Sequence, residues 1–274
     1  MSRVALVTGG SSGIGECTVT ELLDAGYTVY TVARRVEKMQ ALADAGAHVF
    51  AMDVTDDDSM VAGVQRIIDE QGRVDLLVNN AGYGSYGAVE DVPLEEARRQ
   101  FDVNVFGLAR LTQLVTPHMR AQKSGRIINI SSIGGKFYEP FGAWYHATKF
   151  AVEGFSDCLR MELKPFGIKV VIIEPGPIIT EWNEIARDSL LEMSGSGAYA
   201  SYAKKAHRML TEFDKPGRAS RPETVAKKIR KAATKKRPAA RYPVGRGAGM
   251  ITTSRDHTPD AIFDQVISRM YGTR

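Results

Sequence analysis

The amino-acid sequence predicts a doubly wound α/β fold, in which helices cover both faces of a parallel sheet of about seven strands. Short apolar runs alternate with helical patterns, so successive strands would be joined by helical crossovers. The runs are apolar without interruption, as expected for strands that are buried on both faces. The first run leads directly into a glycine cluster and a helix, which is typical of a phosphate-binding turn.

The predicted elements follow one another without an internal repeat or a low-complexity linker, so we expect one domain over residues 1–274. Strands are expected at residues 4–8, 27–32, 48–52, 74–78, 126–130, 169–173 and 241–245. Helices are expected up to Gly26, from near Thr55, from about Pro93 to Leu114, from Tyr145 to about Leu163 and from Pro259 to Met270.

The composition narrows the class of protein. With 274 residues, 43% of them apolar and 25% charged, the chain is a globular protein, and a net charge of +4 does not by itself indicate nucleic-acid binding. Cys17 and Cys158 are too few for a disulfide framework or a zinc site, which favours a reducing cytoplasmic location. The acidic residues 56–58 fit the start of a helix, so we expect no bound metal. Neither a membrane span nor a signal peptide is predicted.

The glycine cluster after the first strand is predicted to bind the pyrophosphate of a cofactor. Its candidate residues are Gly9, Ser11, Ser12, Gly13, Ile14 and Gly15. Glycines let the backbone approach the phosphates, and the following helix offers free N–H groups and a partial positive charge. The spacing is Gly-x-x-x-Gly-x-Gly, which differs from the common Gly-x-Gly-x-x-Gly pattern.

The end of the second strand indicates which dinucleotide is bound. NAD-specific sites usually carry Asp or Glu there to hold the ribose 2′-hydroxyl, but this strand is followed by Arg34 and Arg35. A guanidinium binds a 2′-phosphate bidentately, so we expect NADP(H) rather than NAD(H), with Arg34 as the main contact and Arg35 as the second. The alternative is a solvated pair at the start of a helix.

Two further strand ends provide candidates for the cofactor site. Asp53 and Val54 close the third strand, where Asp53 either hydrogen-bonds the adenine amino group or caps the next helix. Asn80, Ala81 and Gly82 follow the fourth strand, and their small side chains and amide suit a cofactor ribose.

The stretch from Tyr145 to Lys149 is the candidate catalytic centre. In a helix these two side chains lie at i and i+4 on one face, where a phenol and an ammonium form an acid–base pair. A nearby cation favours phenolate, which would make the proton available near neutral pH. Ser132, in the loop after the fifth strand, could hydrogen-bond the oxygen that gains or loses the proton. The alternative is an ordinary Tyr and Lys on a helix surface.

Asn104 lies in the middle of the helix expected at residues 93–114. Asn is unfavourable there, because its side chain competes for backbone hydrogen bonds. We therefore treat Asn104 as a candidate for binding water or backbone, and a simple exposed position is the alternative.

Together these motifs resemble the short-chain dehydrogenase/reductase family, and the tail after Ile179 looks most like its hydroxysteroid and retinol dehydrogenase branch. The matching stretches are Thr8 to Gly15, Asn79 to Gly82, Asn104, Ser132, Tyr145, Lys149 and Pro175 to Thr180, in the family's order. The resemblance implies a Rossmann-type fold, hydride transfer between NADP(H) and a carbonyl/alcohol pair, and a homo-oligomer.

The resemblance also implies roles for the residues. Tyr145 would be the general acid/base, Lys149 would hold the nicotinamide ribose and lower the pKa of Tyr145, and Ser132 would polarise the substrate carbonyl. Asn104 would bind the water of a proton relay. The nicotinamide side would be contacted by residues 175–180, which include Pro175, Gly176, Ile178 and Thr180.

The last third of the chain is expected to shape the substrate site. Large apolar side chains among Gly and Ser at residues 181–220 are interpreted as a helical lid, although they could instead only pack on the body. A lid of this kind favours a bulky hydrophobic ketone or aldehyde, such as a steroid, retinoid, lipid or aromatic compound. The basic stretch 221–241 also has apolar residues along one helical face, which indicates a helix with solvated cationic side chains. The extension to residue 274 ends in an amphipathic helix that could cover the pocket or an oligomer interface.

Two other functions remain open at this point. One is an NADP-binding sensor or scaffold without catalysis. This function is disfavoured because Ser132, Tyr145 and Lys149 are all present. The other is a binder of nucleic acid or membrane surfaces through the basic stretch 221–241. We expect a small-molecule substrate and no nucleic-acid partner.

Overall fold

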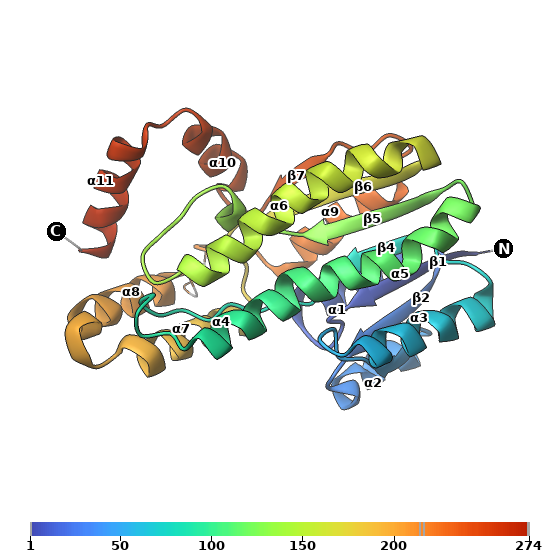
Figure 1. Cartoon of the computed structure of the whole chain (residues 1–274), viewed down its shortest axis with the longest axis horizontal. Coiled ribbons are helices and arrows are strands. Elements are labelled where there is room, and N and C mark those ends of the chain that lie inside the picture. The colour runs from blue at the N-terminus through green and yellow to red at the C-terminus, as the bar shows by residue number, and fades with distance from the viewer. Residues whose placement is uncertain (1, 214, 216, 273–274) are drawn as a thin grey trace.

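The protein contains one sheet of seven parallel strands, in the spatial order β3-β2-β1-β4-β5-β6-β7 (Figure 1). The computed structural model describes residues 2–213, 215 and 217–272, so positions 1, 214, 216 and 273–274 of the expected domain, lid and extension lie outside the described residues. The strands are β1 (Arg3–Thr8), β2 (Tyr27–Ala33), β3 (His48–Ala51), β4 (Leu76–Asn79), β5 (Gly125–Ile130), β6 (Ile168–Pro175) and β7 (Arg241–Val244). The predicted doubly wound α/β fold is confirmed.

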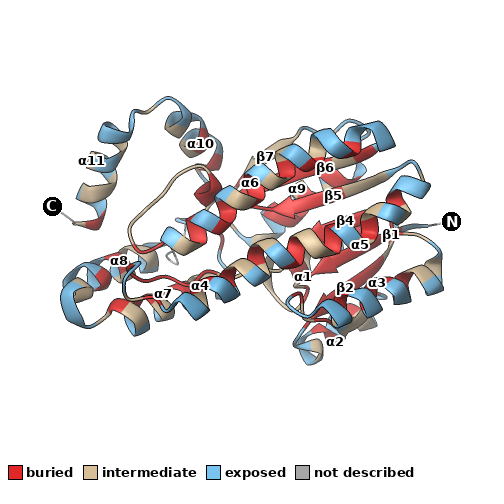
Figure 2. Cartoon of the chain, viewed as in Figure 1, coloured by how far each residue is buried: buried red, intermediate tan, exposed pale blue. Residues whose placement is uncertain are grey.

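Helices cover both faces of this sheet, and the burial pattern of the strands follows from that (Figure 2). One face carries α1 (Gly13–Asp24), α2 (Gln40–Asp44) and α9 (Pro222–Thr234). The other face carries α3 (Asp57–Gln71), α5 (Leu108–Ala121) and α6 (Ala143–Leu163). Ala5 and Val7 of β1 pack toward the first layer, whereas Val4 and Leu6 pack toward the second. Alternate residues of one strand therefore enter two separate cores, which is why the run is apolar throughout.

The strand order places a crevice at the carboxyl edge of the sheet. Because β2 lies on one side of β1 and β4 on the other, the loops that follow β1 and β4 leave toward opposite faces. Four helices lie beyond this edge, namely α7 (Glu181–Ser194), α8 (Ala200–Glu212), α10 (Ala248–Asp256) and α11 (Asp260–Tyr271) (Figure 1). The expected C-terminal helix is α11, whereas α10 was not predicted.

The helix expected at residues 93–114 is longer and is interrupted. It consists of α4 (Leu94–Phe101), a π-helical segment (Asp102–Gly107) that contains Asn104, and α5, which continues to Ala121. Pro117 lies inside α5, although a proline usually marks a helix boundary. A π-helical turn widens the helix at one place and is frequent at functional sites.

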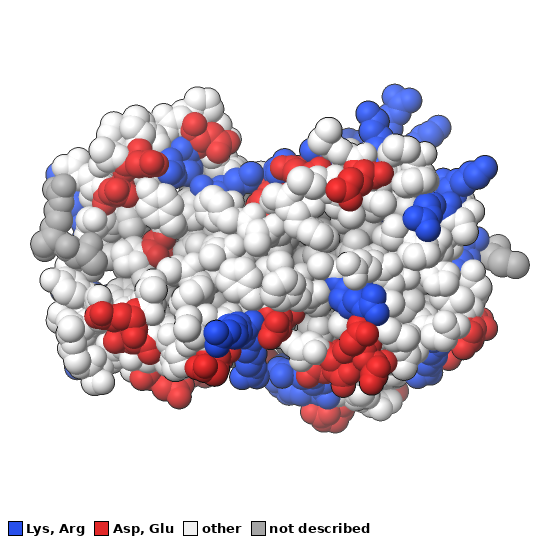
Figure 3. Space-filling view, viewed as in Figure 1, with Lys and Arg blue, Asp and Glu red and all other residues white. Residues whose placement is uncertain are grey.

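Two observations concern surfaces away from the crevice. Among residues 2–213, 215 and 217–272, no helix has the length and apolar composition that crossing a bilayer requires. The basic stretch 221–241 forms α9 and the link from α9 to β7. The end of this link lies at the edge of the sheet where the strands begin, because β7 follows it directly. Figure 3 shows several Lys and Arg side chains projecting from that end of the molecule. The end of the basic stretch is thus separated from the crevice by the length of the sheet, whereas its start follows Ser220, which pairs with the cavity-lining Ile178.

The apolar face of α9 was predicted, and it is buried. Val225 and Ile229 are fully buried, in the same core as Val19 and Leu22 of α1. The long cationic side chains of α9, such as Lys227, lie on its exposed side. The helix therefore belongs to the packing of the sheet layer.

Replacing Ile229 by Ala should destabilise the protein, because it leaves a cavity between α9 and α1. We expect the free energy of unfolding to fall by about 2–4 kcal/mol in urea titrations. Lys227→Ala, on the exposed side of the same helix, is the matched control and should change it by less than about 0.5 kcal/mol. Equal effects of the two substitutions would contradict this orientation of α9.

Candidate active site

One cavity of about 1200 Å³ opens at the carboxyl edge of the sheet. It is lined by the glycine loop, by the ends of β2 to β6 and by side chains of α7, α8, α10 and α11. Every predicted site residue lines this cavity except Gly15 and Asn104. The cavity thus joins the predicted cofactor residues to a region with apolar walls.

The glycine loop after β1 has a backbone that requires glycine at several positions. Gly9 and Gly13 have φ angles of +72° and +59°, in the region that favours glycine. A Cβ on Gly15 would lie 2.1 Å from the carbonyl oxygen of Gly9, so any side chain there would push the loop open. Ser12 precedes α1 without a side-chain cap, which leaves the first N–H groups of the helix for a ligand. These features fit the pyrophosphate of a dinucleotide.

The segment after β4 holds this loop in place. Asn80 Nδ2 donates hydrogen bonds to the carbonyl oxygens of Thr8 at 2.9 Å and Gly9 at 3.3 Å. The backbone N–H groups of Asn80 and Ala81 donate to Thr8 Oγ1 at 3.0 and 2.9 Å. The amide of Asn80 therefore supports the glycine loop, while Ala81 and Gly82 line the cavity beside it.

The two arginines after β2 have different surroundings. Both are exposed and line the cavity. Arg35 forms an ion pair of 3.0 Å with Glu181, the first residue of α7, and Lys38 pairs with the same carboxylate at 3.1 Å. Within the part of the chain that the structure describes, Arg34 has no ion pair. Its guanidinium is therefore the one better placed for an anionic ligand.

Asp53 does not cap the helix that follows β3. Its Oδ1 accepts hydrogen bonds from Thr55 N at 2.9 Å and Thr55 Oγ1 at 2.8 Å, whereas α3 is capped by Asp56, which accepts from Ser59 N at 3.2 Å. The helix begins two residues later than expected because Asp56, and not Asp53, supplies the cap. The capping alternative is wrong, and the contact of Asp53 with adenine stays a prediction. Val54 lines the cavity next to it.

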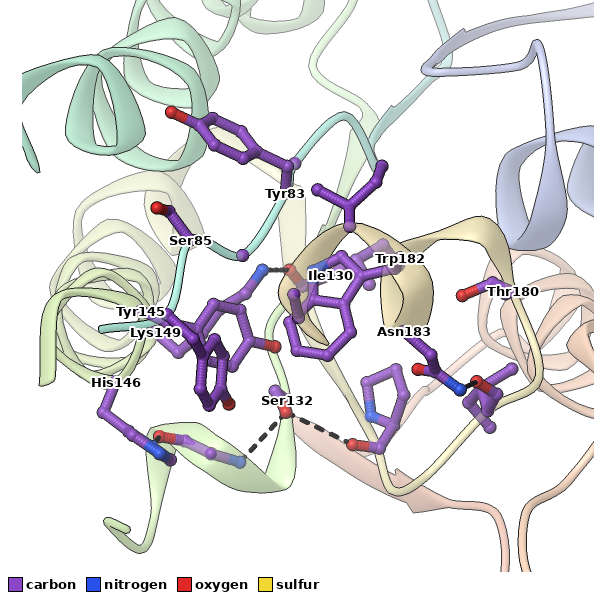
Figure 4. Close-up of a pocket in the computed structure, with 18 of the residues that line it drawn as sticks. Tyr83, Ser85, Ile130, Ser132, Tyr145, His146, Lys149, Thr180, Trp182 and Asn183 are labelled. Carbon is purple, nitrogen blue, oxygen red and sulfur yellow. Dashed lines mark hydrogen bonds between the residues drawn. The ribbon is translucent and has the colours of Figure 1, made fainter. Parts of the chain in front are cut away.

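α6 presents Tyr145 and Lys149 one turn apart, and both are buried (Figure 4). Lys149 Nζ donates a hydrogen bond of 3.0 Å to the carbonyl oxygen of Ile130 and lies 5.8 Å from the ring centroid of Tyr145. Ser132 follows β5 and accepts a hydrogen bond from Gly134 N at 3.0 Å. Figure 4 shows the hydroxyls of Ser132 and Tyr145 on the same side of the cavity. The three predicted catalytic groups are therefore brought together.

Burial dominates the protonation of this centre. Burial raises the pKa of Tyr145 to about 12; the Ser132 hydroxyl lowers it and the charge of Glu139 raises it. Burial also lowers the pKa of Lys149 to about 8, although the charge of Glu153 opposes this. Loss of hydration is the largest influence on the pKa of both groups, and the lowering of the Tyr145 pKa by the Lys149 cation stays a prediction.

Asn104 lies behind the catalytic residues and does not line the cavity. Its Oδ1 accepts from Tyr83 N at 3.0 Å, and its Nδ2 donates to Tyr83 O at 2.9 Å and to Thr148 Oγ1 at 3.1 Å. The side chain is buried, so the exposed alternative is wrong. Asn104 connects the loop after β4 to α6 between Tyr145 and Lys149, and its binding of a relay water stays a prediction.

The cavity wall around Tyr145 contains residues that sequence reasoning did not assign to the site. The ring of Trp182 on α7 lies 4.9 Å from that of Tyr145, and the ring of Tyr86 lies 6.0 Å away. The Tyr86 hydroxyl donates to Glu139 at 3.0 Å, and His146 Nε2 lies 3.8 Å from the same carboxylate oxygen. Trp182 was predicted only as an apolar lid residue. Glu139 carried no spacing signal, because the loop before α6 places it, and His146 lies on α6 next to Tyr145.

The far part of the cavity is apolar. Ile262, Val266 and Met270 lie one turn apart on α11, line the cavity and are 54%, 49% and 57% exposed. Ile185 of α7 also lines it and is 47% exposed. In the described part of the chain, no group of three or more His, Cys, Asp or Glu side chains could hold a metal ion. The site therefore combines a proton-donating centre with an uncovered apolar wall.

Curated relatives match this chain over nearly its full length. The uncharacterized oxidoreductase YusZ of Bacillus subtilis is 36% identical over 97% of this chain and 98% of its own. A 3-ketodihydrosphingosine reductase of Bacteroides thetaiotaomicron is 35% identical over 99% of both chains. An NADPH-dependent 3-dehydrocapnine reductase of Ornithobacterium rhinotracheale is 34% identical over 96% of this chain and 95% of its own.

Solved structures give the same result. A short-chain dehydrogenase from Streptomyces avermitilis is 34% identical with a TM-score of 0.81, covering 100% of this chain and 99% of its own. A metagenomic short-chain oxidoreductase in complex with NADP is 28% identical with a TM-score of 0.69, covering 88% and 96%. A 3-ketoacyl-(acyl-carrier-protein) reductase from Brucella melitensis in complex with NADH is 28% identical with a TM-score of 0.72, covering 85% and 90%.

The family model described as short chain dehydrogenase matches residues 3–190. This range contains the glycine loop, Ser132, Tyr145 and Lys149. The resemblance to the hydroxysteroid and retinol dehydrogenase branch stays a prediction. The chain belongs to the short-chain dehydrogenase family of oxidoreductases, which bind a nicotinamide cofactor.

Proposed function

We propose that this protein is an NADP(H)-dependent oxidoreductase acting on the carbonyl/alcohol pair of a bulky hydrophobic ketone or aldehyde. The observation that carries the proposal is the continuity of one cavity from the glycine loop, past Ser132, Tyr145 and Lys149, to the apolar side chains of α7, α8 and α11. A dinucleotide at the glycine loop and a hydrophobic molecule against these helices would meet at Tyr145.

The protein's own groups supply the proton and the orientation of the substrate. When bound, the nicotinamide would supply or accept the hydride. With a pKa of about 12, Tyr145 is a neutral phenol at neutral pH, the form that donates a proton to an alkoxide. The Ser132 hydroxyl, beside Tyr145, would hydrogen-bond the carbonyl oxygen and orient it. This protonation state suits the step in which the carbonyl is reduced and Tyr145 donates the proton.

The roles proposed for Lys149 and the remaining cofactor residues follow from their positions. With a pKa of about 8, Lys149 is mostly protonated at pH 7, and its ammonium would bind the hydroxyls of the nicotinamide ribose. The segment from Pro175 to Thr180 lines the cavity between the glycine loop and α7, which suits a contact with the nicotinamide. Gly9 to Ile14 would hold the pyrophosphate.

Three observations support NADP(H) as the cofactor. Arg34 lines the cavity at the end of β2 and has no ion pair within the described residues. The 3-dehydrocapnine reductase is an NADPH-dependent relative, and one similar structure holds NADP. Another similar structure holds NADH, so the choice of cofactor rests chiefly on Arg34.

The apolar wall supports a lipid-like ketone as the substrate class. The exposed stripe of Ile262, Val266 and Met270 continues the cavity away from Tyr145, as a long hydrocarbon chain would require. Two relatives are named as reductases of 3-ketodihydrosphingosine and 3-dehydrocapnine. We propose that α7 and α8 form the lid over this chain, with Trp182 covering Tyr145.

Replacing Tyr145 by Phe should abolish most turnover and leave cofactor binding nearly intact. The substitution removes the proton donor and keeps the ring, so kcat should fall by about a hundredfold or more. NADPH consumption, followed by absorbance, would be measured against long-chain 3-keto compounds, steroid ketones and retinal, and NADPH affinity by fluorescence titration. Tyr202→Phe, on the exposed side of α8, is the matched control. Unchanged kcat in the Tyr145 variant would refute its role, and tight NADPH binding without turnover of any compound would favour the sensor function.

Replacing Arg34 by Ala should weaken NADPH selectively. Loss of a charge-assisted contact with a 2′-phosphate should raise KM for NADPH by about 10- to 100-fold and leave KM for NADH nearly unchanged. Arg35→Ala should have a smaller effect, because that guanidinium already pairs with Glu181. Steady-state kinetics with both cofactors checks this, and an equal loss for NADPH and NADH would contradict the assignment.

Replacing Lys149 by Met should change how stability depends on pH. Burial lowers the pKa of Lys149 from 10.5 to about 8, so between these values the unfolded chain binds more protons than the folded one. The free energy of unfolding of the wild type, relative to the variant, should therefore rise across this window by up to about 3 kcal/mol and stay constant below it. Urea titrations of both proteins at several pH values measure this difference. A difference that is flat with pH would show that the Lys149 charge is not penalised.

A further inference from the structure

The charges that line the cavity are not evenly distributed. We define the substrate half as the lining residues within 131–146 and 182–271. Among the described residues, the acidic side chains of this half are Glu139 and Glu192, and it contains no Lys or Arg. The Lys and Arg side chains that line the cavity are Arg34, Arg35, Arg99 and Lys149, which lie outside this half, although Lys149 Nζ is 5.8 Å from the ring centroid of Tyr145. Apart from that ammonium, the charged side chains near the substrate half are therefore acidic.

Glu139 is the buried member of this acidic pair. Its side chain is 14% exposed, whereas Glu192 lies on the exposed side of α7. The hydrogen bond from Tyr86 and the approach of His146 Nε2 both involve Oε1 of Glu139. No ion pair with Lys or Arg is formed by Glu139 within the described part of the chain. Because neither Lys nor Arg pairs with this carboxylate, its charge is available to attract an incoming cation.

Glu139 stays ionised and acts on the proton donor. Burial tends to raise the pKa of Glu139, but His146 and the hydroxyls of Tyr271 and Tyr86 outweigh this and lower it. Its charge in turn raises the pKa of Tyr145. The ring of Tyr86, which bonds Glu139, lies 6.0 Å from the ring of Tyr145. Tyr86 therefore lies between the carboxylate of Glu139 and the ring of the proton donor.

We infer that Glu139 recognises a cationic group of the substrate, so that the substrate is an amphipathic ketone with an ammonium group close to its carbonyl. The inference rests on the proposed function and deepens it. With the ammonium at Glu139 and the carbonyl at Ser132 and Tyr145, the hydrocarbon chain would extend along the apolar stripe of α11. The carboxylate would thus fix which end of the molecule enters the site.

The first test compares two long-chain ketones of equal length, one with an ammonium group and one with a hydroxyl group on the carbon next to the carbonyl. With NADPH at neutral pH, the wild type should show a kcat/KM at least about tenfold higher for the cationic ketone. Glu139→Gln should lose this preference, so that the ratio of its kcat/KM values for the two ketones falls to about one. Glu192→Gln, the matched control, should keep the preference, because its carboxylate is solvated. Thermal unfolding of both variants confirms that they are folded.

Two outcomes would overturn the role of Glu139 while leaving the proposed function in place. One is equal use of both ketones by the wild type, and the other is an equal fall of Glu139→Gln on both, which a merely structural carboxylate would cause. Reduction of neither ketone, despite NADPH binding, would overturn the proposed function and this inference with it.

A second test needs no variant. Dodecylammonium and dodecanol would be compared as competitive inhibitors of the reduction of the hydroxy ketone. Both carry the same hydrocarbon chain, so inhibition by the cation at about tenfold lower concentration would support recognition at a carboxylate. Equal inhibition by the two compounds would contradict it.

Discussion

The hydrogen bond from Lys149 Nζ to the carbonyl oxygen of Ile130, at 3.0 Å, joins α6 to the carboxyl end of β5. An ammonium buried without a partner would be strongly unfavourable, so this contact fixes the height of α6 against the sheet. Tyr145 lies one turn earlier on the same helix, and Ser132 follows Ile130 by two residues. One interaction therefore sets the relative positions of all three groups of the candidate catalytic centre.

The two halves of the cavity differ in the groups that form their surfaces. In the cofactor half, backbone geometry and short hydrogen bonds define the surface, as when Asn80 and Thr8 hold the glycine loop. This part needs little rearrangement to receive a dinucleotide. In the substrate half, exposed apolar side chains such as Val266 line a wide space between helices that lie beyond the sheet. Such a surface specifies its ligand by size and hydrophobicity, and a single buried charge can then decide orientation.

The fold and much of the site could be predicted from sequence because their signals are local. Strands buried on both faces are recognised by continuous apolar runs, and Tyr145 and Lys149 share a helix that ends where expected and begins two residues earlier. The features that were missed depend on distant parts of the chain. The raised pKa of Tyr145 results from burial beside Trp182 and Tyr86, and Glu139 enters the wall through the course of a loop without a pattern of its own. The start of the helix after β3 also has a local signal, but its cap is Asp56, three residues after Asp53.

Burial acts on the charged groups of this site in opposing ways. Burial raises the pKa of Tyr145, which favours the protonated phenol that a proton donor requires. It lowers the pKa of Lys149, which disfavours the ammonium form of that side chain. Ligands that provide oxygen acceptors to Lys149 relieve this cost only in the folded state, so their binding adds to stability by linkage. The same low polarity strengthens attraction between a buried carboxylate and any cation that reaches it. The burial that raises the pKa of Tyr145 therefore also strengthens the interactions that the charges of bound ligands make at Lys149 and at Glu139.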